Sequence, residues 1–154
     1  MNKQQILAKI AEIGLVPVVR AQSADEAMKV VDAIREGGVS VLEITMTVPG
    51  ALTPTEVLAA WTAGADVVKV FPCGALGGAS YIKSLKAPLP QIELIPTGGV
   101  SVKTAADFIK AGALALGVGA DLVDTQAIRD GNARAVTDKA REYVRLVQEA
   151  RASA

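Results

Sequence analysis

The feature that most limits the possible folds is a recurring unit in which a helix-like stretch ends at glycine and passes directly into an apolar run. It occurs three times, as EGGVSVLEI from Glu36, AGADVVKV from Ala63 and AGALALGV from Ala111. Glycine relieves the left-handed backbone that often follows a helix, and each run is short enough for a strand. Runs with so many valines and other apolar residues are typical of parallel strands that are covered on both faces.

The rest of the chain follows the same alternation. Further strands are expected at residues 15–20 and 92–96, and apolar residues at helical spacing predict helices at 4–13, 23–36, 53–63, 101–111 and 132–150. Ser23 and Thr53 each precede a glutamate by three residues, which predicts capping boxes, and Ser101 is a candidate N-cap. Alternating helices and strands predict a parallel sheet, closed into a small barrel or open and doubly wound.

The composition excludes several kinds of site and partner. Sixteen basic and sixteen acidic residues give a formal net charge of zero, which argues against nucleic acid or an anionic membrane as the partner. The chain has no histidine, which excludes Ser-His-Asp and Cys-His catalytic groups and most catalytic zinc sites. Its one cysteine fits a reducing compartment, and no apolar run approaches the about 18 residues of a membrane span. We therefore expect one cytoplasmic domain over residues 1–154 without a metal.

Two charged residues interrupt the apolar strands, Lys69 within VVKVF and Glu43 within VLEI. Burial among valines disfavours the charged form of a lysine, and a neutral amine can form a Schiff base with a carbonyl substrate. A neighbouring carboxylate can then transfer protons. The same residues could instead form a buried ion pair without a catalytic role, or the lysine could reach solvent from the end of its strand.

Glycine-rich loops follow the last strands. PTGG at 96–99 and GVGA at 117–120 could present backbone N–H groups to a phosphate, although tight turns also use glycine. Arg20, at the end of the first expected strand, could bind a carboxylate or remain in solvent. A third loop, residues 71–78, could cover a substrate. Cys73 within it is expected to be a packing residue, because no histidine can activate it.

Six stretches strongly resemble the 2-keto-3-deoxy-6-phosphogluconate (KDPG) and 4-hydroxy-2-oxoglutarate aldolases: VPVVRAQSADEA, EGGVSVLEITMTVPGA, LTPTEVLAAW, AGADVVKVFPCGALGG, IPTGGVS and ALGVGADLV. The resemblance covers nearly the whole chain. It implies an eight-stranded barrel, typically trimeric, that needs no metal and forms a Schiff base on a lysine. The products would be pyruvate with glyceraldehyde 3-phosphate or glyoxylate.

The resemblance also implies roles for individual residues. Lys69 would form the Schiff base, Glu43 would transfer protons and Arg20 would receive the substrate carboxylate. The implied phosphate-binding residues are Thr97, Gly98, Gly99, Gly117, Gly119 and Ala120.

The chain departs from this family by lacking two to three βα units. TVPGALTPT leads directly from the second expected strand into what resembles the family's fifth helix, so the apparent deletion junction lies near residues 48–53. We therefore expect a shortened barrel of about five parallel strands with outer helices, the alternative being an open five-stranded flavodoxin-like sheet. If consecutive strands pair, Glu43 and Lys69 become neighbours, and a direct ion pair would stabilise the ammonium form.

Three functions remain open. The first is a Schiff-base aldolase for a phosphorylated or short 2-keto acid, with activity weakened by the deletion. The second is a catalytically inactive shortened barrel that keeps the fold and phosphate binding. The third is an assembly module that uses exposed strand edges, and such edges also make a homo-oligomer the expected state.

Overall fold

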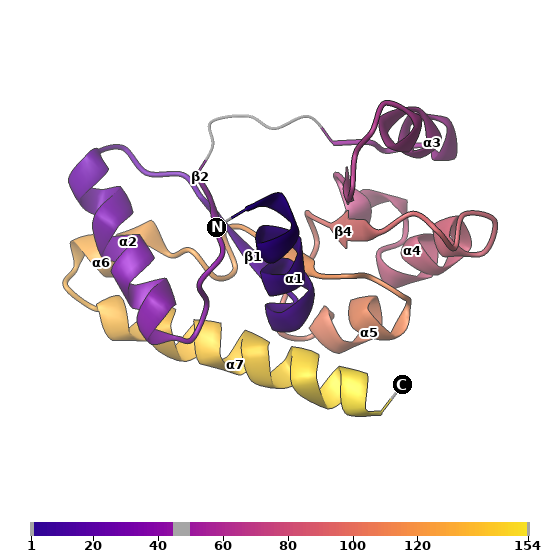
Figure 1. The fold of residues 1–154 in the computed structure, drawn as a ribbon. Helices are drawn as coiled ribbons and strands as arrows, with labels where there is room; N and C mark the ends of the chain where they lie inside the picture. Colours follow the sequence, from indigo (N-terminus) through magenta and orange to yellow (C-terminus); the bar gives the residue numbers. More distant parts are fainter. Residues whose placement is uncertain (1, 45–49, 154) are drawn as a thin grey trace.

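Short parallel strands lie inside a layer of helices in the computed structural model, which describes residues 2–44 and 50–153 (Figure 1). The strands are β1 (Leu15–Val19), β2 (Glu43–Ile44), β3 (Val68–Val70), β4 (Leu94–Pro96) and β5 (Leu116–Val118). The helices are α1 (Lys3–Ile13), α2 (Ala24–Glu36), α3 (Pro54–Thr62), α4 (Ala79–Lys86), α5 (Ala105–Lys110), α6 (Thr125–Arg129) and α7 (Ala133–Ala152), with a 3-10 helix, η1 (Cys73–Leu76). The alternation predicted from the sequence is confirmed.

The order of the strands is that of a barrel. One ladder runs β2-β1-β5 and another joins β3 to β4, both parallel. A bridge between Thr97 and Gly117 connects β4 to β5, so the neighbours follow the order β2-β1-β5-β4-β3. The last strand therefore lies beside the first, as barrel closure requires, whereas a flavodoxin-like sheet has its last strand at an edge. The fold is a shortened barrel.

In the part of the chain that the structure describes, the barrel wall is interrupted between β2 and β3. No ladder joins Glu43–Ile44 to Val68–Val70, and the pairing considered from their order in the sequence is not seen in the described residues. On the β3 side, Ala51 adds one more bridge: its N–H donates to Lys69 and its carbonyl accepts from Phe71. Ala51 therefore lies on the side of β3 away from β4.

Local capping signals largely match the structure. Thr53 and Glu56 form the predicted capping box of α3. Ser23 caps α2, but the Glu26 side chain accepts from the N–H of Gln22, so that capping box forms only in part. The helix expected from residue 101 begins instead at Ala105, after a turn closed onto the Thr104 hydroxyl.

The core lies between the strands and the long helix α7. Figure 1 shows α7 running along one side of the molecule, from α2 and α6 to α5, and it contacts both α2 and α5. Phe108 and Tyr143 are the largest fully buried side chains, and most of the rest are valine, leucine, isoleucine and alanine. In contrast, α3 stands at the periphery and buries only Val57. Within the described residues, no helix is both long enough and apolar enough to cross a membrane.

Candidate active site

The carboxyl ends of β1, β3, β4 and β5 surround a cavity of about 450 Å³. It is lined by seven of the residues singled out from the sequence: Arg20, Thr97, Gly98, Gly99, Gly117, Gly119 and Ala120. They come from the loops that follow β1 and β4 and from the end of β5 and the loop beyond it. Parallel strands of a barrel all end at the same face, so residues far apart in sequence meet there.

Several residues that line this cavity have backbone N–H groups without hydrogen-bond partners in the described part of the chain. In the described part of the chain, the N–H groups of Gly99, Gly119 and Ala120 donate no hydrogen bond. Gly98 and Gly99 both have φ near +80°, a conformation that glycine adopts without strain. Successive unbonded N–H groups form an anion-binding surface, which suits a phosphate group.

Lys69 and Glu43 form an ion pair with 3.5 Å between Nζ and Oε1. Their side chains are 15% and 25% exposed, so both charges are largely removed from water. They come from opposite sides of the interruption in the wall, β3 and β2, and meet through their side chains rather than through a ladder. The sequence predicted that Glu43 and Lys69 lie close together, and they do, although no ladder joins their strands in the described residues.

The ion pair lies beside the cavity and not in its lining. The Lys69 ammonium group is 5.8 Å from the ring centroid of Phe71, and Phe71 lines the cavity. A cation at that distance from an aromatic face is stabilised by the ring. Phe71 therefore connects the lysine to the glycine-rich end of the cavity, which also contains the exposed Arg20.

The Thr97 hydroxyl is turned away from solvent and faces Gly117. A Cβ at Gly117 would overlap Thr97 Oγ1, so the close approach requires glycine. Within the described residues, Thr97 Oγ1 is buried and has no hydrogen-bond partner. The backbone of Thr97 is already used, since its N–H donates to Val70 and its carbonyl accepts from Cys73. Thr97 can therefore reach a bound phosphate only through rotation of its side chain.

The loop at residues 71–78 is held in place. Its residues 73–76 form η1, and the N–H of Gly74 donates to the Gly98 carbonyl at 2.8 Å. Cys73 is fully buried, as a packing residue should be, and burial raises the pKa of its thiol to about 11. The thiol is therefore unreactive at neutral pH, and a mobile cover over the substrate is not supported by this arrangement.

Two long-range contacts, one of them at the cavity, had no signal in the sequence. Asp121, which lines the cavity, accepts a hydrogen bond from Tyr143 on α7. Glu26 accepts one from Arg129 at 2.7 Å and joins α2 to α6. Each contact spans more than 20 residues of chain, so spacing along the sequence could not reveal it. Among the described residues, no three His, Cys, Asp or Glu side chains lie close enough together to hold a metal ion.

Comparison with known proteins identifies the family. The family model described as KDPG and KHG aldolase matches residues 45–139, more than half of the chain. The chain belongs to this family. Its shortened barrel is thus a variant of the aldolase fold, as the resemblance in sequence predicted.

The aldolase relatives are longer than this chain. The 2-dehydro-3-deoxy-6-phosphogalactonate aldolase of Escherichia coli (strain K12) is 47% identical over 79 residues, covering 50% of this chain and 38% of that protein. The 2-dehydro-3-deoxy-phosphogluconate aldolase of Haemophilus influenzae is 23% identical over 207 residues, covering 94% of this chain and 98% of that protein. The second alignment is longer than the 154 residues of this chain, so part of that aldolase has no counterpart here.

A solved structure supports the fold. A KDPG aldolase from Legionella pneumophila, with pyruvate captured as a covalent carbinolamine intermediate, superposes with a TM-score of 0.80 at 19% identity. The match covers 91% of this chain and 98% of that one. At this identity the likeness concerns the fold alone.

Proposed function

We propose that this aldolase-family chain cleaves a 2-keto acid through a Schiff base on Lys69. The observation that carries the proposal is the pairing of a largely buried lysine with a carboxylate beside a cavity rich in unbonded N–H groups. An amine shielded from water, next to a group that can accept its proton, is suited to attack a carbonyl. The relative from Legionella, which forms a carbinolamine with pyruvate, supports the same chemistry.

The reaction begins when the neutral amine of Lys69 adds to the C2 carbonyl and water is lost, leaving a protonated imine. A base removes the proton of the C4 hydroxyl, the C3–C4 bond breaks, its electron pair moves into the imine and the aldehyde leaves. The remaining enamine gains a proton at C3, and water then releases pyruvate and the free lysine. Glu43, at 3.5 Å from the lysine, is the proton carrier in these steps.

The cavity suits substrates with a negative charge at each end. Arg20 receives the carboxylate beside the carbonyl, since a guanidinium group can bind a carboxylate through two hydrogen bonds. The loops at Gly98–Gly99 and Gly119–Ala120 receive the distal anion. KDPG, which yields glyceraldehyde 3-phosphate, carries a phosphate there, and 4-hydroxy-2-oxoglutarate, which yields glyoxylate, carries a second carboxylate. Thr97 and Gly117 complete the phosphate site.

The deletion is expected to slow turnover. Part of the longer aldolase from Haemophilus influenzae has no counterpart in this chain, so some of the residues that surround a substrate there are expected to be missing here. The alternative function is therefore a catalytically inactive shortened barrel that still binds phosphate. Formation of the Schiff base distinguishes the active aldolase from the inactive barrel.

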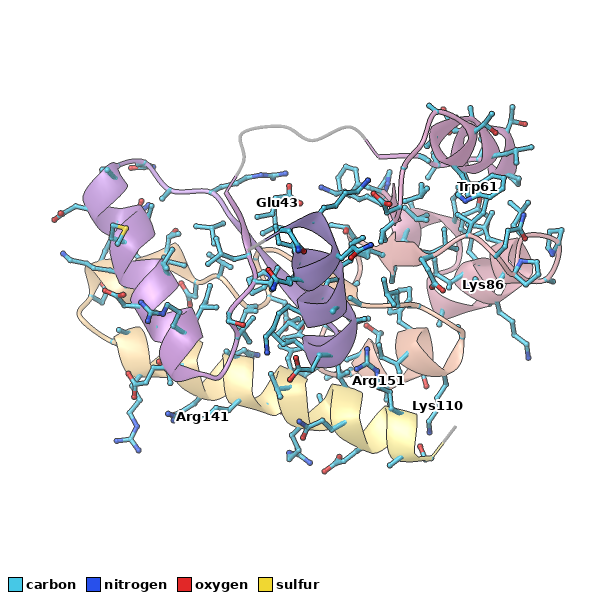
Figure 2. All side chains as sticks on the ribbon, in the orientation of Figure 1. Glu43, Trp61, Lys86, Lys110, Arg141 and Arg151 are labelled. Carbon is cyan, nitrogen blue, oxygen red and sulfur yellow. The ribbon has the colours of Figure 1, made fainter. Side chains whose placement is uncertain are left out.

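Borohydride trapping with pyruvate tests the proposal directly. We expect a reduced pyruvate adduct on Lys69, located by intact and peptide mass spectrometry, and its loss in Lys69→Met. Lys86 provides a matched control, because its side chain is 19% exposed and also lies 3.5 Å from a carboxylate, yet it is remote from Glu43 (Figure 2). Lys86→Met should keep the adduct. A folded protein that forms no adduct at high pyruvate concentration contradicts the aldolase mechanism and favours the inactive barrel.

We also propose that copies of the chain associate. On the peripheral helix α3, Leu58 and Trp61 are 44% and 41% exposed, and Figure 2 shows Trp61 at the end of the molecule remote from α2. The ladder also ends at β2, which has one unpaired edge within the described residues. Exposed apolar residues and strand edges are commonly covered by another chain. The partner of this face would be a second copy.

A further inference from the structure

The anion-binding cavity contains a carboxylate in its own wall. Among the described residues that line it, only Arg20 and Asp121 carry a charge. Asp121 follows directly after Gly119 and Ala120, whose N–H groups are unbonded in the described part of the chain, as is its own. A free carboxylate at this position would repel a phosphate group bound by the same loop.

The Asp121 side chain is held by two residues of α7. The hydroxyl of Tyr143 donates to Asp121 Oδ2 at 2.5 Å, and the ammonium group of Lys139 lies 3.8 Å from the same oxygen. Tyr143 is fully buried, whereas the Asp121 side chain is 34% exposed. The restraint therefore comes from a fixed side chain of the core acting on a side chain at the rim of the cavity.

The Tyr143 hydroxyl is suited to act as a permanent donor. Burial, and secondarily the hydrogen bond to Asp121, raises the pKa of this hydroxyl, so it stays protonated at neutral pH. Lys139 supplies a positive charge beside the carboxylate and partly offsets its field. The other buried hydroxyl of α7, that of Thr137, donates to Ala33 at the end of α2 and not to the cavity loop. Tyr143 therefore provides the buried polar connection between α7 and that loop.

We propose that Tyr143 is a positioning residue that holds the Asp121 carboxylate against α7, so that the loop presents only N–H groups to a bound phosphate. The inference rests on the proposed function, because it requires that the cavity bind phosphate. Lys139 assists by neutralising the carboxylate. Without the Tyr143 hydroxyl, the Asp121 side chain is free to turn toward the cavity and oppose the anion.

Binding of inorganic phosphate, measured by titration calorimetry, tests the proposal. We expect Tyr143→Phe to weaken phosphate binding by about 5-fold, because the released Asp121 carboxylate would come closer to the bound anion. In the Asp121→Asn background the same change should have less than about a 2-fold effect, because the released side chain carries no charge. Tyr81→Phe is the matched control. It also removes a tyrosine hydroxyl, but that hydroxyl donates to the backbone carbonyl of Leu52, away from the cavity.

Two outcomes overturn the proposal. One is an equal loss of binding from Tyr143→Phe in the wild-type and Asp121→Asn backgrounds, which indicates a structural effect of the lost hydroxyl. The other is unchanged binding in Tyr143→Phe. Thermal unfolding of each variant without phosphate confirms that the titrated protein is folded. Pyruvate trapping at Lys69 needs no phosphate, so a protein that forms the adduct but fails this test retains the proposed Schiff-base function and loses only this inference.

Discussion

Replacing Thr97 with valine is expected to make the protein more stable. Thr97 is 7% exposed, and its Oγ1 is buried without a hydrogen-bond partner in the described part of the chain. Folding therefore removes this hydroxyl from water and gives it no partner in return. Valine has the same shape and lacks the hydroxyl, and Thr97 directly follows strand β4, where a β-branched apolar residue is well accommodated.

The magnitude follows from the cost of an unpaired polar group. A buried donor or acceptor without a partner costs about 1–3 kcal/mol, and we expect Thr97→Val to recover about 1–2 kcal/mol of it. For a chain of this size, that gain corresponds to a rise in the thermal midpoint of about 3–6 °C. Urea unfolding should show the same gain in free energy with an unchanged slope, because the surface exposed on unfolding is nearly the same.

Thr137→Val provides the matched control. Thr137 is 1% exposed, but its hydroxyl donates to the Ala33 carbonyl at 2.9 Å. The same substitution there should lower the free energy of unfolding by about 1 kcal/mol. The loss is modest because the Ala33 carbonyl keeps its bond from Gly37. A Thr97→Val protein that is destabilised as much as Thr137→Val would refute the reasoning, since it would show that Thr97 Oγ1 has a partner in solution.

Two further predictions concern acid stability and association. The hydrogen bond from the Gln22 backbone, followed by the contact with Arg129, lowers the pKa of Glu26 below 4.5. This interaction therefore stabilises the fold above about pH 4.5, and the stabilisation is lost as the pH falls through the lowered pKa of the folded state. Glu26→Gln should lower the free energy of unfolding at pH 7, and urea unfolding at acidic pH should show a smaller loss. A loss that does not depend on pH would contradict this. Replacing both Leu58 and Trp61 with serine should reduce the mass measured by analytical ultracentrifugation to that of a monomer, whereas Ile6→Ser, an exposed apolar residue of α1, should not. A wild-type protein that is monomeric at every concentration would exclude association through α3.

Much of the candidate site could be predicted from the sequence. Lys69 and Glu43 were recognisable because a charge within an apolar strand is costly and needs a reason. The glycine-rich loops were recognisable because they follow strands directly. All of the predicted anion-binding residues line one cavity, because parallel strands in a barrel end at one face. Their roles in binding and catalysis remain predictions.

Boundaries and distant contacts were less predictable. The strands are shorter than the apolar runs that predicted them, since β3 comprises only Val68–Val70 and β5 only Leu116–Val118. An apolar run indicates that a segment is buried. A ladder forms only where a neighbouring strand also lies in register with that segment.

The sequence by itself determined the alternation of helices and strands, the apolar inner layer and the family. Only the tertiary structure decided that β5 lies beside β1, that Glu43 meets Lys69 across an interruption in the wall, and that Tyr143 restrains Asp121. The physical reason is the range of the interactions involved. Periodicity and capping act over a few residues and are visible in the order of the amino acids. Strand partners and side-chain contacts between distant segments depend on how the whole chain closes.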